Sequence, residues 1–371
     1  MKTKEPIHIL QYGMTPVYGG TEAYVINLYR NIDRSKVQFD FFVGEDVVMP
    51  YEDEVKSLGA NVYHKYVSPK ESIIKMYKNL KDILKEHKEI KGIEMNCNFV
   101  SNPIPLILAH KYKLPVVIYH AHNAGNMNKE SFKSKFLSKF VRKLIDRYAT
   151  NKVACSELAG QYMFRSNDFE IINNAIDTKK YSYNLEIRKE VRKELGLTDN
   201  QYVIGFIGRI QYQKNPDFII NIFEEVYKRD NNAVLVIAGD GDMREEIERL
   251  IVEKGLEDSV KMLGQRKDAE RLYQGFDLFL LPSRFEGFPI VLIEAETSGL
   301  PCIISDAITK SIDITGTVKF LSINENSKVW ADEILKYKQE HIRIDMSNEV
   351  KAKGFDIVEL GKKMTKLYSN I

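Results

Sequence analysis

Cysteine is scarce in this 371-residue sequence, which has three, at Cys97, Cys155 and Cys302. An odd number of widely separated cysteines does not suit a disulfide framework. Cys155 and Cys302 also stand among apolar residues, where a cysteine behaves as a small hydrophobic side chain. We therefore expect buried free thiols and a reducing compartment.

Long apolar runs and a strong net charge are missing as well. No segment approaches the roughly 18 consecutive apolar residues of a membrane-spanning helix. Residues 1–13 pass into a short apolar run without the apolar core of a signal peptide. The formal net charge of +2 provides no general attraction to nucleic acid. The sequence predicts a cytoplasmic, soluble protein that is attached to a membrane at most peripherally, with no nucleic-acid partner.

Apolar residues, by contrast, make up 44% of the sequence, which is enough for sizeable cores. At about 150 residues per domain, the length suggests two or three domains. Short apolar runs alternate with helical patterns from residue 7 onward, a pattern typical of doubly wound α/β sheets. A charged stretch at 181–200 separates two such series, so we place a domain boundary near residue 180.

The most informative stretch is residues 276–306. Apolar runs at 276–281 and 303–304 predict two buried parallel strands. A helix is expected between them, with Pro289 in its first turn and Gly299 just beyond its end. The loop before this helix lies at the edge where open α/β sheets bind ligands, and the N–H groups that open the helix suit a phosphate.

Two carboxylates mark this unit, Glu286 in the loop and Glu294 eight positions later in the helix. A carboxylate accepts two hydroxyl hydrogen bonds well. The spacing lets the two side chains reach different parts of one extended ligand. A solvated helix face is the alternative interpretation.

A pair of cations follows the strand predicted at 202–210. That strand delivers Gly208 and Arg209 to the ligand-binding edge, and Lys214 comes five residues later, before Pro216 and a helix. Arg binds a diphosphate through its planar fork and Lys binds it as a point charge. We therefore predict a diphosphate site, with two solvated surface cations as the alternative.

Gly19 and Gly20 follow the first predicted strand, at 7–11, and precede Thr21, which fits the N-cap of a helix. Glycine lets the backbone approach a phosphate closely because it adds no side chain. A tight strand-to-helix turn is the alternative interpretation.

His120 and His122 follow the strand predicted at 116–119. If that strand continues, its alternation turns both side chains to one face. A zinc site would need further ligands, and no Cys, Asp or Glu stands close in the sequence, so we predict no metal. A structural role is the alternative to contact with a ligand.

Residues 128–150 carry seven Lys or Arg against two acidic residues, a net charge of +5. Such a basic amphipathic helix either faces the core with a solvated basic back or contacts an anionic membrane surface. Its apolar side chains recur at helical spacing, at Phe132, Phe136, Phe140, Leu144 and Ile145.

These motifs together resemble the retaining glycosyltransferases of family 4, which have the GT-B fold. The spacing from Glu286 to Glu294, with Gly-Phe-Pro after the first Glu, resembles the E-x7-E signature of that family. The string at 208–216 strongly resembles its donor-diphosphate motif, and Gly19-Gly20 resembles its N-terminal glycine loop. The resemblance covers nearly the whole sequence. Within the family, the EGFPIVLIEA and WADEILKY strings look like the bacterial capsular and exopolysaccharide branch.

The resemblance implies two Rossmann-like, doubly wound α/β domains that face a central cleft, with the last helix crossing back to the first domain. The acceptor-side domain would comprise residues 1–180 and 355–371, and the domain that binds the nucleotide sugar residues 181–354. Asp240 and Asp242 form a D-x-D string that resembles the family's AGDG loop, where no metal is bound, rather than a metal motif.

The resemblance also assigns roles to residues. Glu286 would hold hydroxyls of the donor sugar, Glu294 would hold the ribose, and the cations would stabilise the departing diphosphate without metal or cofactor. One histidine, with His122 favoured over His120, would support the oxocarbenium-like centre. The catalytic residues would be Arg209, Lys214, Glu286 and one of His120 and His122, and the other donor-binding residues Gly19, Gly20, Gly208, Gly287, Phe288, Ile290, Val291 and Glu294.

The implied reaction is transfer of a hexose from a nucleoside diphosphate sugar, with a UDP-sugar favoured, to a hydroxyl of a saccharide or lipid-linked saccharide. Configuration would be retained, and the product would serve capsule or exopolysaccharide biosynthesis. Two alternatives stay open. A sugar-nucleotide epimerase of the same fold would turn over its donor without an acceptor, and a non-catalytic nucleotide-sugar-binding subunit of a polysaccharide assembly complex would bind the donor without turnover.

Overall fold

A computed structural model of the chain describes residues 5–15, 19–44, 48–49, 51–100, 102–123, 132–340 and 343–370, with backbone alone at 69–70, 132–135 and 339–340. Two compact units divide the chain. Unit 1 comprises residues 1–175 and 357–371, and unit 2 comprises residues 176–356. Each unit is built on its own parallel sheet, so the predicted α/β fold with two Rossmann-like domains is confirmed.

Unit 1 alternates strands and helices along the chain. Its strands pair in the order β3-β2-β1-β4-β5-β6-β7. The order reverses between β1 and β4, and the crevice at such a reversal is where open α/β sheets bind ligands. The elements are β1 (Ile7–Tyr12), α1 (Gly20–Asn31), β2 (Val37–Gly44), α2 (Glu52–Ser57), β3 (Val62–Tyr66), α3 (Pro69–Glu86), β4 (Ile90–Cys97), α4 (Ile104–Lys111), β5 (Val116–Ala121), α5 (Phe132–Tyr148), β6 (Asn151–Ala154), α6 (Glu157–Met163), β7 (Glu170–Ile171) and, after unit 2, α14 (Ile357–Ser369).

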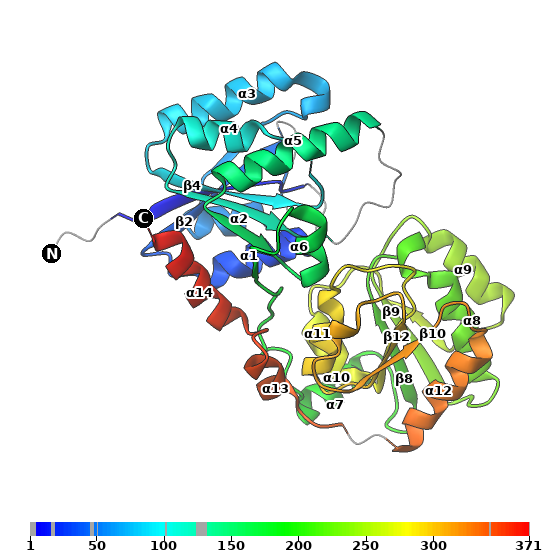
Figure 1. The fold of residues 1–371 in the computed structure, drawn as a ribbon. Coiled ribbons are helices and arrows are strands. Elements are labelled where there is room, and N and C mark those ends of the chain that lie inside the picture. Colours follow the sequence, from blue (N-terminus) through cyan, green and yellow to red (C-terminus); the bar gives the residue numbers. More distant parts are fainter. Residues whose placement is uncertain are drawn as a thin grey trace. The chain divides into compact units, whose positions relative to one another are not determined.

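Helices cover both faces of this sheet (Figure 1). Helices α3 to α6 contribute to one core, through side chains such as Leu80 and Ile145. Helices α1, α2 and α14 contribute to the other core, through side chains such as Leu28. The strands supply both cores because alternate side chains point to opposite faces. In β5, Val117 belongs to the first core and Ile118 to the second.

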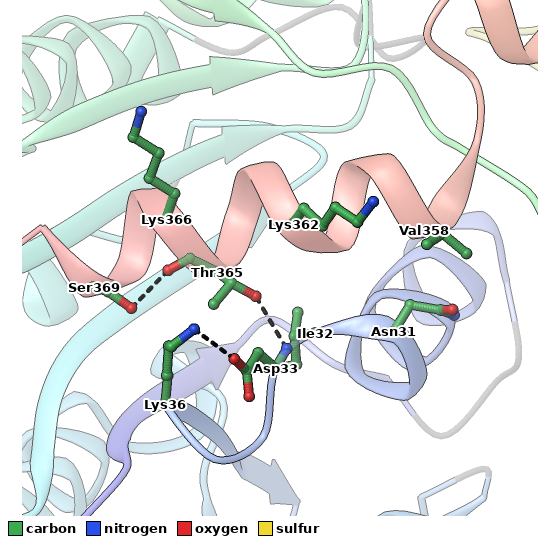
Figure 2. A pocket seen from close by; sticks show the side chains of 9 residues that line it. All are labelled: Asn31, Ile32, Asp33, Lys36, Val358, Lys362, Thr365, Lys366 and Ser369. Atoms are coloured by element: carbon green, nitrogen blue, oxygen red, sulfur yellow. Dashed lines mark hydrogen bonds and ion pairs between the residues drawn. The ribbon is translucent and has the colours of Figure 1, made fainter. Parts of the chain in front are cut away.

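The last helix, α14, packs on α1 and β2. The predicted return of the last helix to the first domain is therefore confirmed. Gly361 permits a close approach, since an added Cβ there would lie 2.3 Å from the carbonyl oxygen of Asn31. The N–H of Asp33 donates a hydrogen bond to Oγ1 of Thr365 at 3.1 Å (Figure 2).

A cavity of about 470 Å³ lies next to this contact, between α14 and the turn that joins α1 to β2 (Figure 2). Lys36, Lys362 and Lys366 line it, but Lys36 pairs with Asp33 and Lys362 pairs with Glu359. The turn enters β2 at its amino end. The cavity is therefore at the edge of the sheet opposite the carboxyl ends of the strands, away from the residues predicted to bind a ligand.

Unit 2 repeats the alternation, with the strand order β10-β9-β8-β11-β12-β13 and a reversal between β8 and β11. Helices α8, α9 and α12 lie on one face of its sheet and α7, α10 and α11 on the other (Figure 1). The elements are α7 (Leu185–Glu194), β8 (Tyr202–Ile207), the 3₁₀ helix η1 (Tyr212–Lys214), α8 (Pro216–Tyr227), β9 (Ala233–Ala238), α9 (Arg244–Glu253), β10 (Val260–Met262), α10 (Ala269–Gly275), β11 (Leu278–Leu281), α11 (Ile290–Thr297), β12 (Cys302–Ser305), the 3₁₀ helix η2 (Lys310–Ile312), β13 (Val318–Leu321), α12 (Ser327–Glu340) and α13 (Ser347–Ala352).

The segments that begin and end unit 2 pair with each other. Ile176 and Asp356 form an isolated parallel bridge, and the N–H of Ile176 donates to the carbonyl of Phe355 at 3.0 Å. The hydroxyl of Thr178 donates to the Asp356 carboxylate at 2.6 Å. These contacts close the unit at the point where the chain enters and leaves it.

Helix α11 differs from its prediction at one end. Pro289 is its N-cap, with ψ of 112°, and the helix begins one residue later, at Ile290. The prediction of Pro289 inside the first turn is therefore wrong by one position, because an extended ψ at that residue is not helical. Gly299 lies just beyond the other end with φ of +67°, as predicted for a left-handed terminating residue.

The prediction of buried free thiols is confirmed for Cys155 and Cys302. Cys155 and Cys302 are buried and free, and Cys97 is free and partly buried. Burial raises the pKa of the Cys155 thiol to about 11, which makes the thiol unreactive near neutral pH. Within the part of the chain that the structure describes, no helix combines the length and apolar character needed to cross a membrane.

Candidate functional site

The sheet of unit 2 brings two loops of predicted site residues together. Strands β8 and β11 are parallel neighbours at the reversal of strand order. The loops that follow them, 208–215 and 282–289, therefore leave the same edge of the sheet. This edge holds Arg209, Lys214 and Glu286, the residues of the second domain predicted to be catalytic.

Lys214 and Glu286 form an ion pair across these loops. Nζ of Lys214 lies 2.5 Å from Oε1 of Glu286, and the two side chains are 12% and 8% exposed. Nε2 of Gln213 donates to the other carboxylate oxygen at 3.1 Å. A sugar diphosphate that separated this pair would find a cation for its phosphates beside an acceptor for its hydroxyls.

Contacts between the two loops hold this pair in place. The carbonyl of Gln213 accepts a hydrogen bond from the N–H of Arg284 at 2.8 Å. Nδ2 of Asn215 donates to the carbonyl of Pro282 at 3.1 Å. The Arg284 guanidinium also stacks on Tyr212, with its carbon 4.2 Å from the ring centroid. The loops are thus joined on both sides of Lys214.

Gly208 and Arg209 follow β8 at the same edge. Arg209 is exposed. A Cβ placed on Gly208 would lie 3.5 Å from Cε of Lys214, so the lysine side chain passes over this glycine. Gly239, in the predicted AGDG loop, packs directly against the backbone of Gly208. An added Cβ there would lie 1.9 Å from the carbonyl oxygen of Gly208, and φ of Gly239 is +142°, which makes glycine necessary at this position.

Glu294 lies in α11 between two tyrosine hydroxyls. The hydroxyl of Tyr181 donates to Oε1 at 2.7 Å and the hydroxyl of Tyr273 donates to Oε2 at 2.9 Å. Burial raises the pKa of Glu294, and the two hydroxyl groups partly offset that rise. Each carboxylate oxygen has two lone pairs. Glu294 can therefore accept further hydrogen bonds from a ligand while the tyrosines fix its position.

The remaining donor-binding residues predicted in unit 2 surround the start of α11. Gly287 and Phe288 precede the helix, and Ile290 and Val291 form its first turn. Phe288 stacks flat on Phe355, with ring centroids 5.8 Å apart and an interplanar angle of 2°. The amino end of a helix attracts phosphate, so this stack fixes the chain where a diphosphate would approach.

In unit 1, Gly19 and Gly20 stand at the amino end of α1. The helix begins at Gly20 with Gly19 as its N-cap, so the prediction of Thr21 as N-cap is wrong by two positions. The carboxylate of Glu22 explains the difference, because it accepts hydrogen bonds from the N–H of Gly19 at 3.1 Å and from the N–H and hydroxyl of Thr15. An added Cβ at Gly20 would meet no described atom within 4 Å.

His120 and His122 turn to one side at the end of β5, as strand alternation predicts. Their rings stack with centroids 4.0 Å apart, and Tyr24 of α1 packs on both, at 5.0 and 5.3 Å. His120 is fully buried and His122 is partly exposed. Burial, reinforced by the neighbouring His120, holds the pKa of His122 well below its ordinary value. The His122 ring is therefore neutral near pH 7.

Sequence reasoning missed the polar partners of these histidines. Nδ1 of His120 lies 2.9 Å from Oε1 of Glu94, and Nε2 of His122 lies 2.9 Å from Oδ1 of Asn96. Both partners belong to β4, which pairs with β5. Glu94 and Asn96 stand at alternate positions in the buried part of β4, among Ile93 and Met95. Polar side chains there are costly to bury without partners. That pattern was the available signal.

The basic helix α5 divides its apolar side chains between core and solvent. Ser138, Val141 and Ile145 are buried, whereas Phe136 and Phe140 are 74% and 47% exposed. The interpretation that these apolar residues all face the core is therefore wrong for the two aromatics. The buried face of α5 carries Ser138, Val141 and Ile145, and the two phenylalanines lie on a different face of the helix.

Part of the segment predicted to form a basic helix, 128–150, lies beyond the observed side chains. Residues 128–131 and the side chain of Phe132 lie outside the described part of the chain. Among the residues that the structure does describe, no group of three His, Cys, Asp or Glu side chains is placed to hold a metal ion.

Comparison with known proteins identifies a relative that matches most of the chain and others that match parts of it. A family model described as glycosyl transferases group 1 matches residues 187–354. The putative glycosyltransferase EpsF of Bacillus subtilis is 33% identical over 339 residues, which cover 90% of this chain and 87% of that protein. The UDP-Gal:alpha-D-GlcNAc-diphosphoundecaprenol alpha-1,3-galactosyltransferase of Escherichia coli is 26% identical over 234 residues, which cover 58% of this chain and 56% of that protein.

Solved structures share the fold along nearly the whole chain. Anabaena HepE in complex with UDP and glucose has a TM-score of 0.77 at 19% identity, covering 98% of this chain and 99% of that chain. WaaG, a glycosyltransferase involved in lipopolysaccharide biosynthesis, has a TM-score of 0.69 at 16% identity, covering 98% and 100%. The two parallel sheets and their connections thus define a GT-B glycosyltransferase fold. The chain belongs to the glycosyl transferases group 1 family, since its similarity to EpsF extends over most of both proteins.

Proposed function

We propose that this protein is a retaining, metal-independent hexosyltransferase of family 4. It transfers a hexose from a UDP-sugar to a hydroxyl of a saccharide or lipid-linked saccharide in capsule or exopolysaccharide biosynthesis. The observation that carries the proposal is the pair of Lys214 and Glu286 at the reversal of strand order in unit 2. Two relatives support the donor, because HepE was solved with UDP and glucose and the E. coli enzyme is named for UDP-Gal.

The diphosphate of the donor would bind Arg209, Lys214 and the start of α11. As the glycosidic bond breaks, negative charge grows on the diphosphate, and fixed cations and helix N–H groups stabilise that charge more than they stabilise the intact donor. Lys214 would exchange Glu286 for a phosphate. This exchange releases the Glu286 carboxylate to accept hydrogen bonds from sugar hydroxyls. The two cations supply the positive charge, so the proposed reaction needs no metal ion.

Other parts of the donor would meet the remaining predicted residues. Glu294, held by its two tyrosines, would accept hydrogen bonds from the ribose hydroxyls. The backbone at Gly19 and Gly20 would contact the donor phosphates. His120 or His122 would support the oxocarbenium-like centre, and the partial exposure of His122 favours it for this role.

A patch on α5 would attach the protein to a membrane where a lipid-linked acceptor is presented. Phe136, Leu137 and Phe140 are 74%, 43% and 47% exposed, and Lys139 and Lys143 are exposed on the same helix. Aromatic side chains enter the headgroup region, while lysines are attracted to anionic lipids. The acceptor in the name of the E. coli relative is linked to diphosphoundecaprenol, in line with such a surface.

Release of nucleoside diphosphate from a panel of UDP-, GDP- and ADP-sugars tests the proposed reaction. The assay compares wild type with Glu286→Ala, with and without a membrane lipid extract and EDTA. We expect release of UDP that depends on the extract, persists in EDTA and collapses in the variant. Binding of a donor without release would favour the non-catalytic subunit, and conversion of the donor without an acceptor would favour the epimerase. A requirement for a divalent metal contradicts the proposed mechanism.

Sedimentation with lipid vesicles tests the α5 patch. Vesicles that contain phosphatidylglycerol should bind the protein, and vesicles of phosphatidylcholine alone should not. Replacing Phe136 and Phe140 by Ser should lower the partition coefficient onto the vesicles at least about tenfold, because each apolar side chain contributes about 1.5–3 kcal/mol when fully buried. A matched double variant of Leu185 and Val252, which are 53% and 60% exposed in unit 2, should bind like wild type. Equal losses in both variants would refute the patch.

A further inference from the structure

A buried carboxylate in unit 1 lies at the centre of a hydrogen-bond network beneath the two histidines. Glu94 is fully buried in β4. Its Oε2 accepts hydrogen bonds from the hydroxyl of Tyr368, in α14, and from Nε2 of Gln11 at 3.1 Å. Its Oε1 faces Nδ1 of His120 at 2.9 Å.

A second branch of the network leads from Glu94 to His122. Nδ2 of Asn96 donates to Oε1 of Gln11 at 2.9 Å, and Oδ1 of Asn96 lies 2.9 Å from Nε2 of His122. Gln11 and Asn96 are buried in the neighbouring strands β1 and β4. The network therefore crosses the reversal of strand order in unit 1, at the edge where an open α/β sheet binds its ligand.

The carboxylate fixes the direction of every hydrogen bond in both branches. An ionised Glu94 only accepts hydrogen bonds, so Nδ1 of His120 then carries a hydrogen. Gln11 presents its NH₂ group to Glu94 and its oxygen to Asn96. Asn96 then presents its own oxygen to His122, whose Nε2 must carry the hydrogen.

The nitrogens left without hydrogen in neutral rings are Nε2 of His120 and Nδ1 of His122. Both atoms, and the hydroxyl oxygen of Tyr24 that packs on the two rings, are buried without a hydrogen-bond partner among the described residues. A buried acceptor that lacks a donor is unfavourable. Two acceptors suit the hydroxyl groups of a ligand, whereas phosphate oxygens would need donors.

We propose that Glu94 is a positioning residue that sets the tautomers of both histidines, directly for His120 and through Gln11 and Asn96 for His122. The rings then present hydrogen-bond acceptors to hydroxyl groups of the sugar substrate. The identity of that substrate rests on the proposed function, but the tautomers do not. Tyr368 connects this arrangement to α14, at the other end of the chain.

Glu94→Gln is nearly isosteric and replaces one acceptor atom by a donor. If the new NH₂ group faces His120, that ring must accept at Nδ1 and carry its hydrogen on Nε2. If the group faces Gln11, the amides of Gln11 and Asn96 must both turn over, and His122 must then accept at Nε2. Either orientation changes the tautomer of one histidine.

Nitrogen-15 NMR of the histidine rings, assigned with His120→Gln and His122→Gln, tests the proposal. The wild type should carry hydrogen on Nδ1 of His120 and on Nε2 of His122, and Glu94→Gln should change one of the two. The opposite tautomer or a doubly protonated ring in the wild type overturns the proposal, whether or not Glu94→Gln folds. An unchanged pair of tautomers in folded Glu94→Gln overturns it as well.

Kinetics with matched tyrosine variants give a second readout. Tyr29 and Tyr368 are both buried and both pack on Phe39. Each donates a side-chain hydrogen bond, Tyr29 to Gln38 at 2.5 Å and Tyr368 to Glu94. Tyr368→Phe should shift the His120 Nδ1 signal and lower kcat about tenfold, the effect of one lost hydrogen bond to a charged group, with little change in KM. Tyr29→Phe should do neither.

The outcomes separate this inference from the proposed function. If both tyrosine variants lower kcat equally and leave the ring signals unchanged, the network is only structural and the proposal fails. If the wild type shows the expected tautomers but transfers no sugar, the proposed function fails while the assignment of Glu94 stands.

Discussion

The ion pair of Lys214 and Glu286 predicts opposite effects of its two members on UDP binding. Lys214→Met removes the cation proposed to meet the phosphates. A charge-assisted hydrogen bond contributes about 1.5–3 kcal/mol, so the Kd for UDP should rise about 10- to 100-fold. Glu286→Gln removes a carboxylate that lies 2.5 Å from the same lysine and competes with the diphosphate for it. UDP should therefore bind this variant more tightly, by up to about tenfold or 1.4 kcal/mol.

Turnover of the intact donor should respond differently. Transfer should fall in both variants, because Glu286 is proposed to hold the sugar and Lys214 the diphosphate. Calorimetric titration with UDP measures the first effect and release of UDP from the donor measures the second. Glu224→Gln is a matched control, since Glu224 pairs with Lys254 at 2.6 Å in the same unit. This variant should change neither the Kd for UDP nor the rate of UDP release. Weaker UDP binding by Glu286→Gln, or unchanged binding by Lys214→Met, would refute the reasoning.

Three other residues give predictions of defined sign. Glu296 is fully buried, and burial raises its pKa to about 7. Because this folded pKa exceeds the unfolded one, protonation of Glu296 stabilises the fold below about pH 4.5, and this stabilisation is lost as the pH rises through 7. Glu296→Gln cannot lose a proton there. Between pH 5 and 8 its unfolding free energy, measured by calorimetry, should therefore rise by about 2 kcal/mol relative to that of the wild type. An unchanged difference would show that Glu296 does not titrate there. Tyr273→Phe removes a hydroxyl that donates to Glu294, so the pKa of the Glu294 carboxyl should rise further. More of this carboxyl is then protonated at pH 6 than in the wild type, and UDP binding should weaken more between pH 8 and pH 6. An equal pH dependence of UDP binding in the two proteins would count against the ribose contact. Gly239→Ala places a Cβ 1.9 Å from a backbone carbonyl oxygen and should raise the donor KM about tenfold. Gly255→Ala, where φ is also positive but an added Cβ meets no described atom within 4 Å, should leave KM unchanged, and equal effects of the two would refute a specific role for Gly239.

Local signals were sufficient to predict the central unit of the second domain. Apolar runs, Pro289 and Gly299 agree on a strand, a loop, a helix and a strand at 276–306, and these are β11, α11 and β12. The pairing of Lys214 with Glu286 could not be predicted. These residues are 72 positions apart, and they meet only because β8 and β11 are neighbours, a relation that periodicity does not specify.

The network in unit 1 shows a similar limit. Tyr368 and Glu94 are 274 positions apart, so no local pattern could join them. The predicted start of α1 was wrong for a different reason. Thr21 has the propensity of an N-cap, but the carboxylate of Glu22 reaches back to Gly19 and stabilises a helix start two residues earlier than an N-cap at Thr21 predicts.

The configuration of the newly formed glycosidic bond tests the proposed retaining, metal-independent transfer most directly. The anomeric coupling in the proton NMR spectrum of the product, formed in EDTA from an α-configured UDP-sugar, reports that configuration. Retention predicts an α-linked product whose formation continues in EDTA and is lost in Glu286→Ala. A β-linked product, or no product until a divalent metal is supplied, would contradict it.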